Sequence, residues 1–119
     1  MSSSVVAVQD MDDLYEAVEN ANEKKKQLLV LEFIGSTSYR STCEFMKPIV
    51  ESVANTYKNK ADFCTVDVDK NEFKDLAKAF RVQALPTFLM IMDYQTVELI
   101  VAPDKQELIK SINKLATTK

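Results

Sequence analysis

Residues 27–33 read QLLVLEF, a stretch in which apolar side chains point to both sides of an extended chain. A strand with one wet face alternates polar and apolar residues, whereas a strand covered on both faces is a nearly continuous apolar run. The stretch is therefore predicted to be the central strand of a sheet. Its acidic residue, Glu32, is expected to be buried and neutral, because desolvation raises the pKa of a carboxyl group.

Outward from this strand, strand-like and helix-like patterns alternate along the chain. Asp10 can cap the first helix, Pro48 predicts a kink in the second, and the pattern Asp104-x-x-Glu107 predicts a capping box for the last. The predicted strands are Val5–Val8, Gln27–Phe33, Asp62–Asp67, Thr87–Met92 and Thr96–Val101, the last two joined by a hairpin at Asp93-Tyr94-Gln95. The predicted helices are Met11–Glu23, Cys43–Tyr57, one from Asp69 or Asn71 through Phe80, and one after Pro103 to Leu115. The apolar residues of the second helix that recur at helical spacing are Phe45, Met46, Ile49, Val50, Val53, Ala54 and Tyr57.

This order, βαβαβαββα, predicts an α/β fold with a central mixed sheet of about five strands flanked by four helices. No internal repeat or Pro/Gly/Ser-rich linker divides the 119 residues. We therefore expect one domain, residues 1–119, with frayed ends at residues 1–4 and 117–119. The lysine run 24–26 is interpreted as a solvated helix end.

The composition excludes several classes of function. A formal net charge of −3 argues against a nucleic-acid binder. The apolar run 28–31 is far too short to span a membrane, and no secretory signal is visible at the start, so a cytoplasmic location is expected. The chain has no histidine, one glycine (Gly35) and two cysteines (Cys43 and Cys64). A metal site, a phosphate-binding loop and any other cofactor site are therefore not expected.

The arrangement and several motifs resemble the thioredoxin family, in particular the plant cytosolic h-type branch. The resemblance covers about residues 5–115 and is strongest in two segments, VDVD at 66–69 and VQALPTF at 82–88. It implies the thioredoxin fold and a cis peptide bond before Pro86. The central strand resembles the one that carries the family's buried carboxylate, here Glu32, whose usual lysine partner is replaced by Thr65.

Pro48 sets the register of the active-site loop. In the family this proline follows the second active-site cysteine by five residues, which makes Cys43 the resolving cysteine. The WCGPC motif is then replaced by Tyr39-Arg40-Ser41-Thr42-Cys43, and about two extra residues are inserted near 36–38. Disulfide reduction needs an exposed thiolate and a second thiol that releases the mixed disulfide. We therefore expect no catalytic residues and no dithiol–disulfide oxidoreductase activity, with Glu32 as a relic or structural carboxyl.

The cysteines leave two interpretations open. Cys64 lies in a strand pattern and reads as a small buried hydrophobe. Cys43 is either buried in the same way or a single reactive thiol, and Arg40 would favour its thiolate. Arg40 itself is either solvated or joins the helix amides in attracting an acidic group.

The resemblance also implies a protein-binding surface. In the family, the residue before the cis-proline pairs with an extended client segment, which needs no cysteine. The surface would comprise Tyr39, Arg40, Ser41, Thr42, Leu85, Pro86 and Ala102. Ala102 stands where the family has glycine, and alternatively Pro86 only shapes its loop.

The leading hypothesis is a redox-inactive, thioredoxin-like binding protein: a holdase-like chaperone or a regulatory adaptor in stress or defence. Its partners would be client or regulatory proteins, not nucleic acids or membranes, and it would be a monomer or weak homodimer. The alternative is a single-thiol redox protein or sensor that uses Cys43 through glutathionylation or an intermolecular disulfide.

Overall fold

The computed structural model describes residues 4–24, 27–37 and 39–116. Several predictions therefore fall outside the described residues. They concern the frayed ends at 1–3 and 117–119, most of the lysine run 24–26, and position 38 of the inserted segment. No helix within the described ranges is long and apolar enough to cross a membrane.

The elements follow the predicted order. They are β1 (Val5–Ala7), α1 (Met11–Glu23), β2 (Leu28–Ile34), α2 (Arg40–Thr56), β3 (Ala61–Asp67), α3 (Asn71–Ala79), β4 (Thr87–Met92), β5 (Gln95–Val101) and α4 (Lys105–Ala116). The strands form one sheet in the order β1-β3-β2-β4-β5. β1 and β2 run parallel to β3, whereas β4 is antiparallel to β2 and to β5. The predicted mixed α/β sheet is confirmed.

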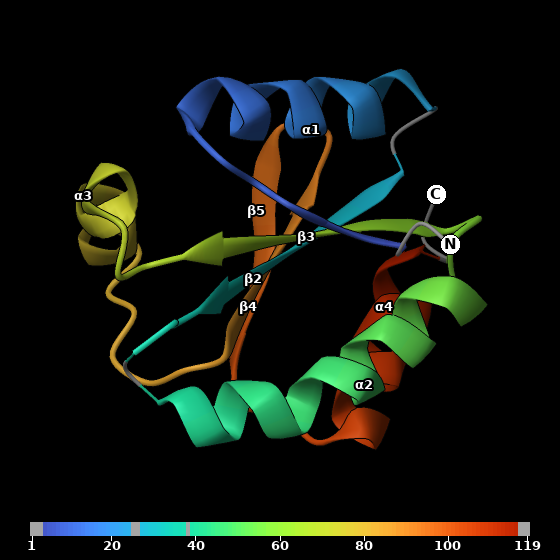
Figure 1. Ribbon diagram of the computed structural model, residues 1–119. Helices are drawn as coiled ribbons and strands as arrows, with labels where there is room; N and C mark the ends of the chain where they lie inside the picture. Colours follow the sequence, from blue (N-terminus) through green and yellow to red (C-terminus); the bar gives the residue numbers. More distant parts are fainter. Residues whose placement is uncertain (1–3, 25–26, 38, 117–119) are drawn as a thin grey trace.

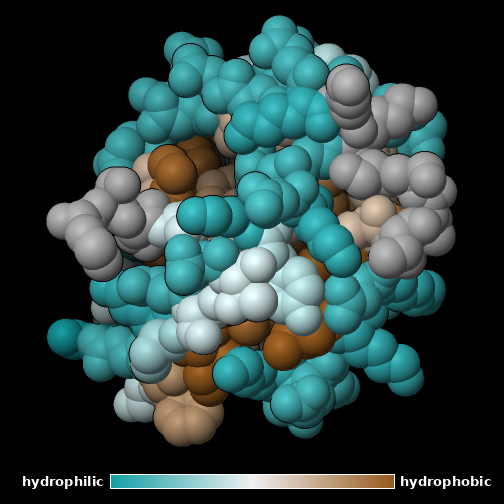
Figure 2. All heavy atoms as spheres, turned by 90° about the vertical axis from the view of Figure 1, so that its right-hand side faces the viewer, coloured by the Kyte–Doolittle hydropathy of each residue, from teal (hydrophilic) through white to brown (hydrophobic). Residues whose placement is uncertain are grey.

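β2 lies at the centre of the sheet and of the core. α1 and α3 cover one face of the sheet, and α2 and α4 cover the other (Figure 1). Alternate β2 residues serve the two sides: Leu29, Leu31 and Phe33 join the α1/α3 cluster, while Leu28 and Val30 join the α2/α4 cluster. Both predictions for this strand, its central place and its two-sided burial, are confirmed. Seen from the side of the chain ends, the surface is mainly hydrophilic with small apolar areas (Figure 2).

Local capping chemistry sets two of the helix starts. The Asp10 carboxylate accepts a hydrogen bond from the Asp13 amide at 2.8 Å. Asp104 and Glu107 form the predicted capping box, with reciprocal amide-to-carboxylate bonds of 2.8 and 2.9 Å. α3 begins at Asn71, one of the two predicted starts, without a side-chain cap.

The structure differs from the predictions at several boundaries. Five of the ten strand ends move by one residue, and the hairpin is a tight two-residue turn in which Asp93 and Tyr94 both have positive φ. α2 begins at Arg40, three residues before the predicted start. Phe45, one of the apolar residues of α2 assigned to the helical pattern, is 71% exposed and so does not belong to the buried face. Successive helix residues are about 100° apart, so the face that buries Cys43, Met46 and Val50 turns Phe45 to solvent.

Candidate functional site

The candidate site begins where β2 ends and the chain turns into α2. Two carboxylates from the end of β3 and the turn after it hold this turn. The amide of Ser36 donates to Asp67 at 3.3 Å, and the amide of Thr37 donates to Asp69 at 2.8 Å. Asp67 also accepts a bond from the Asp69 amide at 2.9 Å. The described part of the inserted segment is therefore fastened to the β3–α3 turn, a role for the VDVD aspartates that the sequence analysis missed.

Tyr39 connects this turn to the segment before β4. It adopts the left-handed conformation, with φ 54°, immediately before α2. Its hydroxyl donates to the carbonyl oxygen of Gln83 at 3.4 Å, and about half of the residue (53%) is exposed. Tyr39 therefore brings the start of α2 beside the Leu85-Pro86 segment.

The first turn of α2 presents Arg40, Ser41 and Thr42 to solvent. Arg40 Nε lies 3.0 Å from Glu44 Oε1, one helical turn on. Arg40 pairs with Glu44 on the exposed surface of the helix, and 71% of its side chain is accessible, which agrees with the interpretation of Arg40 as a solvated residue. Phe45, 71% exposed, lies on the same end of the helix, off the face that carries Cys43 and Met46.

Leu85 and Pro86 do not match the predicted exposed surface. Their peptide bond is cis, as the family resemblance implied. Both side chains are buried, Leu85 at 4% exposure in the α1/α3 cluster, because they fill the space where β4 enters the core. Within the described ranges, neither the amide nor the carbonyl of Leu85 has a hydrogen-bond partner. At this position the unpartnered group is therefore the backbone of Leu85, whereas its side chain belongs to the core.

Ala102 completes this group of residues. Its amide donates to the carbonyl of Pro86 at 2.8 Å, so these two predicted site residues lie together. Ala102 has φ 44°, in the left-handed region that favours glycine. The conformation expected of a glycine position is retained, and alanine occupies it at a cost.

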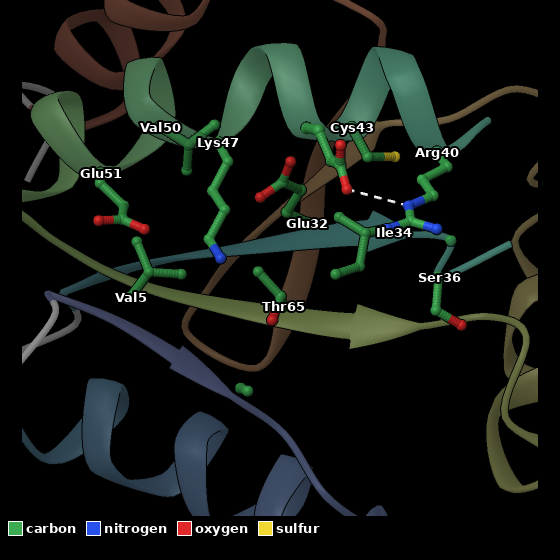
Figure 3. Close-up of a pocket in the computed structure, with 13 residues that line it drawn as sticks. Val5, Glu32, Ile34, Ser36, Arg40, Cys43, Lys47, Val50, Glu51 and Thr65 are labelled. Atoms are coloured by element: carbon green, nitrogen blue, oxygen red, sulfur yellow. Dashed lines mark hydrogen bonds and ion pairs between the residues drawn. The ribbon is translucent and has the colours of Figure 1, made fainter. Parts of the chain in front are cut away.

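A cavity of about 670 Å³ opens behind this surface, between α2 and strands β1, β2 and β3 (Figure 3). The strands supply Glu32, Ala7 and Thr65, while α2 supplies Cys43, Arg40 and Lys47. Among the residues that the structure describes, no group of three or more potential ligands is placed to hold a metal ion.

Burial raises the pKa of two ionisable groups that line the cavity, Glu32 and Cys43. Glu32 is 4% exposed, and burial raises its pKa to about 7. The upward direction of this shift was predicted from the place of Glu32 in the central strand. Burial also raises the pKa of the Cys43 thiol, and the charges of Glu32, Asp67 and Asp69 raise it further. A hydrogen bond with the Gly35 backbone opposes these effects. Arg40, which was expected to favour the thiolate if the thiol is accessible, is not among the groups that shift the pKa of Cys43.

The two cysteines occupy different environments. Cys64 lies in β3 within the core, and burial raises the pKa of its thiol to about 12. That location confirms its interpretation as a small buried hydrophobe. Cys43 is 8% exposed and lines the cavity.

Comparisons with known proteins extend over nearly the whole chain. The thioredoxin family profile matches residues 5–114. Thioredoxin H2-1 of Oryza sativa subsp. japonica is 36% identical over 119 residues, covering 98% of this chain and 80% of that protein. Thioredoxin H3 of Arabidopsis thaliana is 32% identical, covering 95% and 91%. The crystal structure of a Nicotiana alata thioredoxin has a TM-score of 0.80 at 31% identity, covering 96% of this chain and 94% of that chain.

These relatives correct one expectation. The altered loop 39–43 led us to expect that the chain is not an enzyme and has no dithiol–disulfide oxidoreductase activity. Proteins named thioredoxins, which are oxidoreductases, match it over nearly its full length. The expectation that oxidoreductase activity is absent is therefore wrong. It rested on five residues of one loop, whereas the similarity to thioredoxins extends over nearly the whole chain.

The buried carboxyl predicts a specific pH dependence of stability. The pKa of Glu32 rises from 4.5 to about 7 on folding, so the folded state holds this proton more tightly. Its stabilising contribution is complete below about pH 4.5 and is lost as the pH rises through about 7, a change of about 3 kcal/mol. Urea unfolding of wild type and Glu32→Gln across this range should show that Glu32→Gln lacks this fall. Glu51→Gln, on the exposed rim, is the matched control and should keep it; equal slopes for wild type and Glu32→Gln would contradict the assignment.

The left-handed alanine predicts a stabilising substitution. Ala102→Gly should raise the free energy of unfolding by about 0.5–1 kcal/mol, because relief of the left-handed penalty exceeds the added freedom of the unfolded chain. The same change inside a helix, Ala17→Gly in α1, should lower it by about 1 kcal/mol. Chemical denaturation of both variants measures the contrast. Destabilisation by Ala102→Gly would show that position 102 gains nothing from glycine.

Proposed function

The chain belongs to the thioredoxin family, and from this premise we propose that it acts by binding extended segments of other proteins. Its role would be that of a holdase-like chaperone or a regulatory adaptor in stress or defence, in the cytoplasm. We further propose that residues 39–43 stand in the place of the family's active-site loop, so that client contact in this atypical member does not depend on a cysteine pair. The client surface, as used below, comprises Tyr39, Arg40, Ser41, Thr42, Leu85, Pro86 and Ala102, with Phe45 added at its edge.

The observation that carries the proposal is the unpartnered backbone of Leu85. Its amide and carbonyl find no partner among the described residues. An extended segment that pairs with them would add main-chain hydrogen bonds, the mode known as β-augmentation. Tyr39 on one side and Ala102 on the other flank this position, because they bond to the carbonyls of Gln83 and Pro86.

Exposed apolar side chains supply contact area around this backbone. Tyr39 and Phe45 project from the start of α2, and Val101 is exposed next to Ala102. Aromatic side chains contribute strongly to protein interfaces, since they bury large areas at low conformational cost. The same surface would accept a second copy of the chain weakly, in keeping with a monomer or weak homodimer.

Client binding of this kind does not require the thiol of Cys43. The side chain is nearly buried and faces the cavity under α2. Hydrogen bonds to Leu85 and contacts with Tyr39 and Phe45 involve no sulfur. Cys43→Ser should therefore retain client binding.

The test compares two tyrosines of similar exposure. Suppression of heat-induced aggregation of a client protein, and affinity for an extended apolar peptide, should fall about fivefold or more in Tyr39→Ala and in Phe45→Ser. Tyr15→Ala, at 61% exposure on α1, is the matched control and should behave as wild type. Equal losses at Tyr15 and Tyr39, or no client protection by the wild type, would overturn the proposal.

A second candidate function is favoured by the position of Cys43. Its thiol lines an open cavity, whereas Cys64 is enclosed in the core. In this alternative the protein is a single-thiol redox protein or sensor, modified by glutathione or by an intermolecular disulfide.

Mass spectrometry after mild oxidation of the folded protein tests this alternative. One disulfide adduct is expected on Cys43, none on Cys64, and none at all in Cys43→Ser. A folded wild-type protein that stays unmodified under conditions that oxidise glutathione would rule the alternative out.

A further inference from the structure

We infer that the cavity under α2 binds small sulfur compounds that carry a primary ammonium group, with the ammonium beside Glu32 and the sulfur at Cys43. Aminothiols and their disulfides are the chemical class. The inference rests on the second candidate function, the single thiol of Cys43, and adds the kind of molecule that this thiol would meet.

Small side chains leave the space for such a molecule. Ala7, Thr65 and Glu32 are neighbours across β1, β3 and β2, with Thr65 in register with both of the others. They therefore lie on one face of the sheet, below α2, and two of the three are small. The resulting 670 Å³ lies within the range of small-ligand sites.

The unpaired group in this cavity is a carboxyl. Glu32 reaches from the central strand toward α2 (Figure 3). Only 4% of Glu32 is exposed, and no ion pair or hydrogen bond of its side chain is found among the described residues. A buried carboxylate without a partner is costly, and a compact cation beside it offsets that cost.

The other charges of the cavity do not supply this partner. Arg40 is held by Glu44 at 3.0 Å. Lys47 and Glu51 extend from α2 across the cavity toward the strands with opposite charges (Figure 3), and no ion pair between Lys47 and Glu32 is found among the described residues. With Glu32, Glu44 and Glu51 ionised against Arg40 and Lys47, the lining carries one carboxylate in excess, which favours a cation over an anion.

The charge of the ligand also controls the reactivity of Cys43. Negative charges on Glu32, Asp67 and Asp69 raise the pKa of this thiol and so reduce the thiolate. An ammonium group beside Glu32 offsets part of that effect, whereas an anionic reagent adds to it. A cationic reagent therefore promotes its own reaction.

The covalent step is a thiol–disulfide exchange. The Cys43 thiolate attacks one sulfur of the small disulfide and forms a mixed disulfide, and the S–S bond of the reagent breaks. The other half leaves as a thiolate and takes up the proton that Cys43 lost. Cys43 is oxidised, and the disulfide is the oxidant.

Three methanethiosulfonates that differ in charge test the site. The 2-aminoethyl, methyl and 2-sulfonatoethyl reagents all form a disulfide with a thiolate and release methanesulfinate. At about pH 8.5, where Glu32 is ionised, mass spectrometry gives the rate of modification of Cys43, divided by the rate for free glutathione. We expect the aminoethyl reagent to exceed the methyl reagent by about tenfold, with the sulfonatoethyl reagent slowest.

Variants assign the preference to the carboxyl. Glu32→Gln should reduce the aminoethyl-to-methyl rate ratio to about one, whereas Asp75→Asn, which removes an exposed carboxyl on α3 outside the cavity, should leave the ratio unchanged. Thr65→Leu, which fills the cavity floor, should slow the aminoethyl reagent and provides an independent test if Glu32→Gln does not fold. A sulfonatoethyl rate equal to the aminoethyl rate, or a ratio that survives Glu32→Gln, would overturn the inference.

A disulfide arm separates this inference from the function on which it rests. Cystamine, a disulfide with two ammonium groups, is compared with neutral 2-hydroxyethyl disulfide. If the methanethiosulfonate order holds but neither disulfide modifies Cys43, the cavity site stands and the single-thiol function fails. If both disulfides react equally in wild type and Glu32→Gln, the thiol function stands and the ammonium site is wrong.

Discussion

Strand β2 has no face in contact with water, and the remaining elements are arranged to keep it so. Apolar side chains on both of its faces require helices on both sides of the sheet, and its central place requires β3 and β4 as neighbours. The same strand ends at the turn into α2. The position of the candidate site therefore follows from the burial of β2, since the end of the strand determines where Tyr39 and the first turn of α2 emerge.

The burial of β2 also explains the chemistry of the cavity. Glu32 lies on the α2 side of a strand that is covered on both faces. Burial therefore raises the pKa of its carboxyl group and makes the charged form costly. Thr65 and Ala7 beside it are too small to close the space, and Lys47 forms no ion pair with Glu32 among the described residues. A carboxyl, a thiol and an open volume thus meet in one place. The client surface lies at the front of α2, where an unpaired backbone and exposed aromatic side chains meet.

Much of this arrangement could be predicted from local sequence. The strand 27–33 and the caps at Asp10 and Asp104 each carry their structural signal within a few residues, whereas the cis bond before Pro86 was implied by the family resemblance. What could not be predicted depends on contacts between distant segments. Asp67 and Asp69 accept hydrogen bonds from the turn before α2, and Glu44 forms an ion pair with Arg40. The side chain of Leu85 turns into the core, and its backbone has no partner among the described residues. The absence of oxidoreductase activity that loop 39–43 led us to expect was wrong as well, because nearly the whole chain matches proteins named thioredoxins.

Amide hydrogen exchange with and without a bound extended client peptide tests the central claim most directly, because that claim concerns a particular piece of backbone. The account predicts that the peptide slows exchange at the Leu85 amide and in residues 39–42, and leaves α1 unchanged. Slowed exchange confined to the free edges at β1 or β5, with Leu85 unaffected, would contradict it.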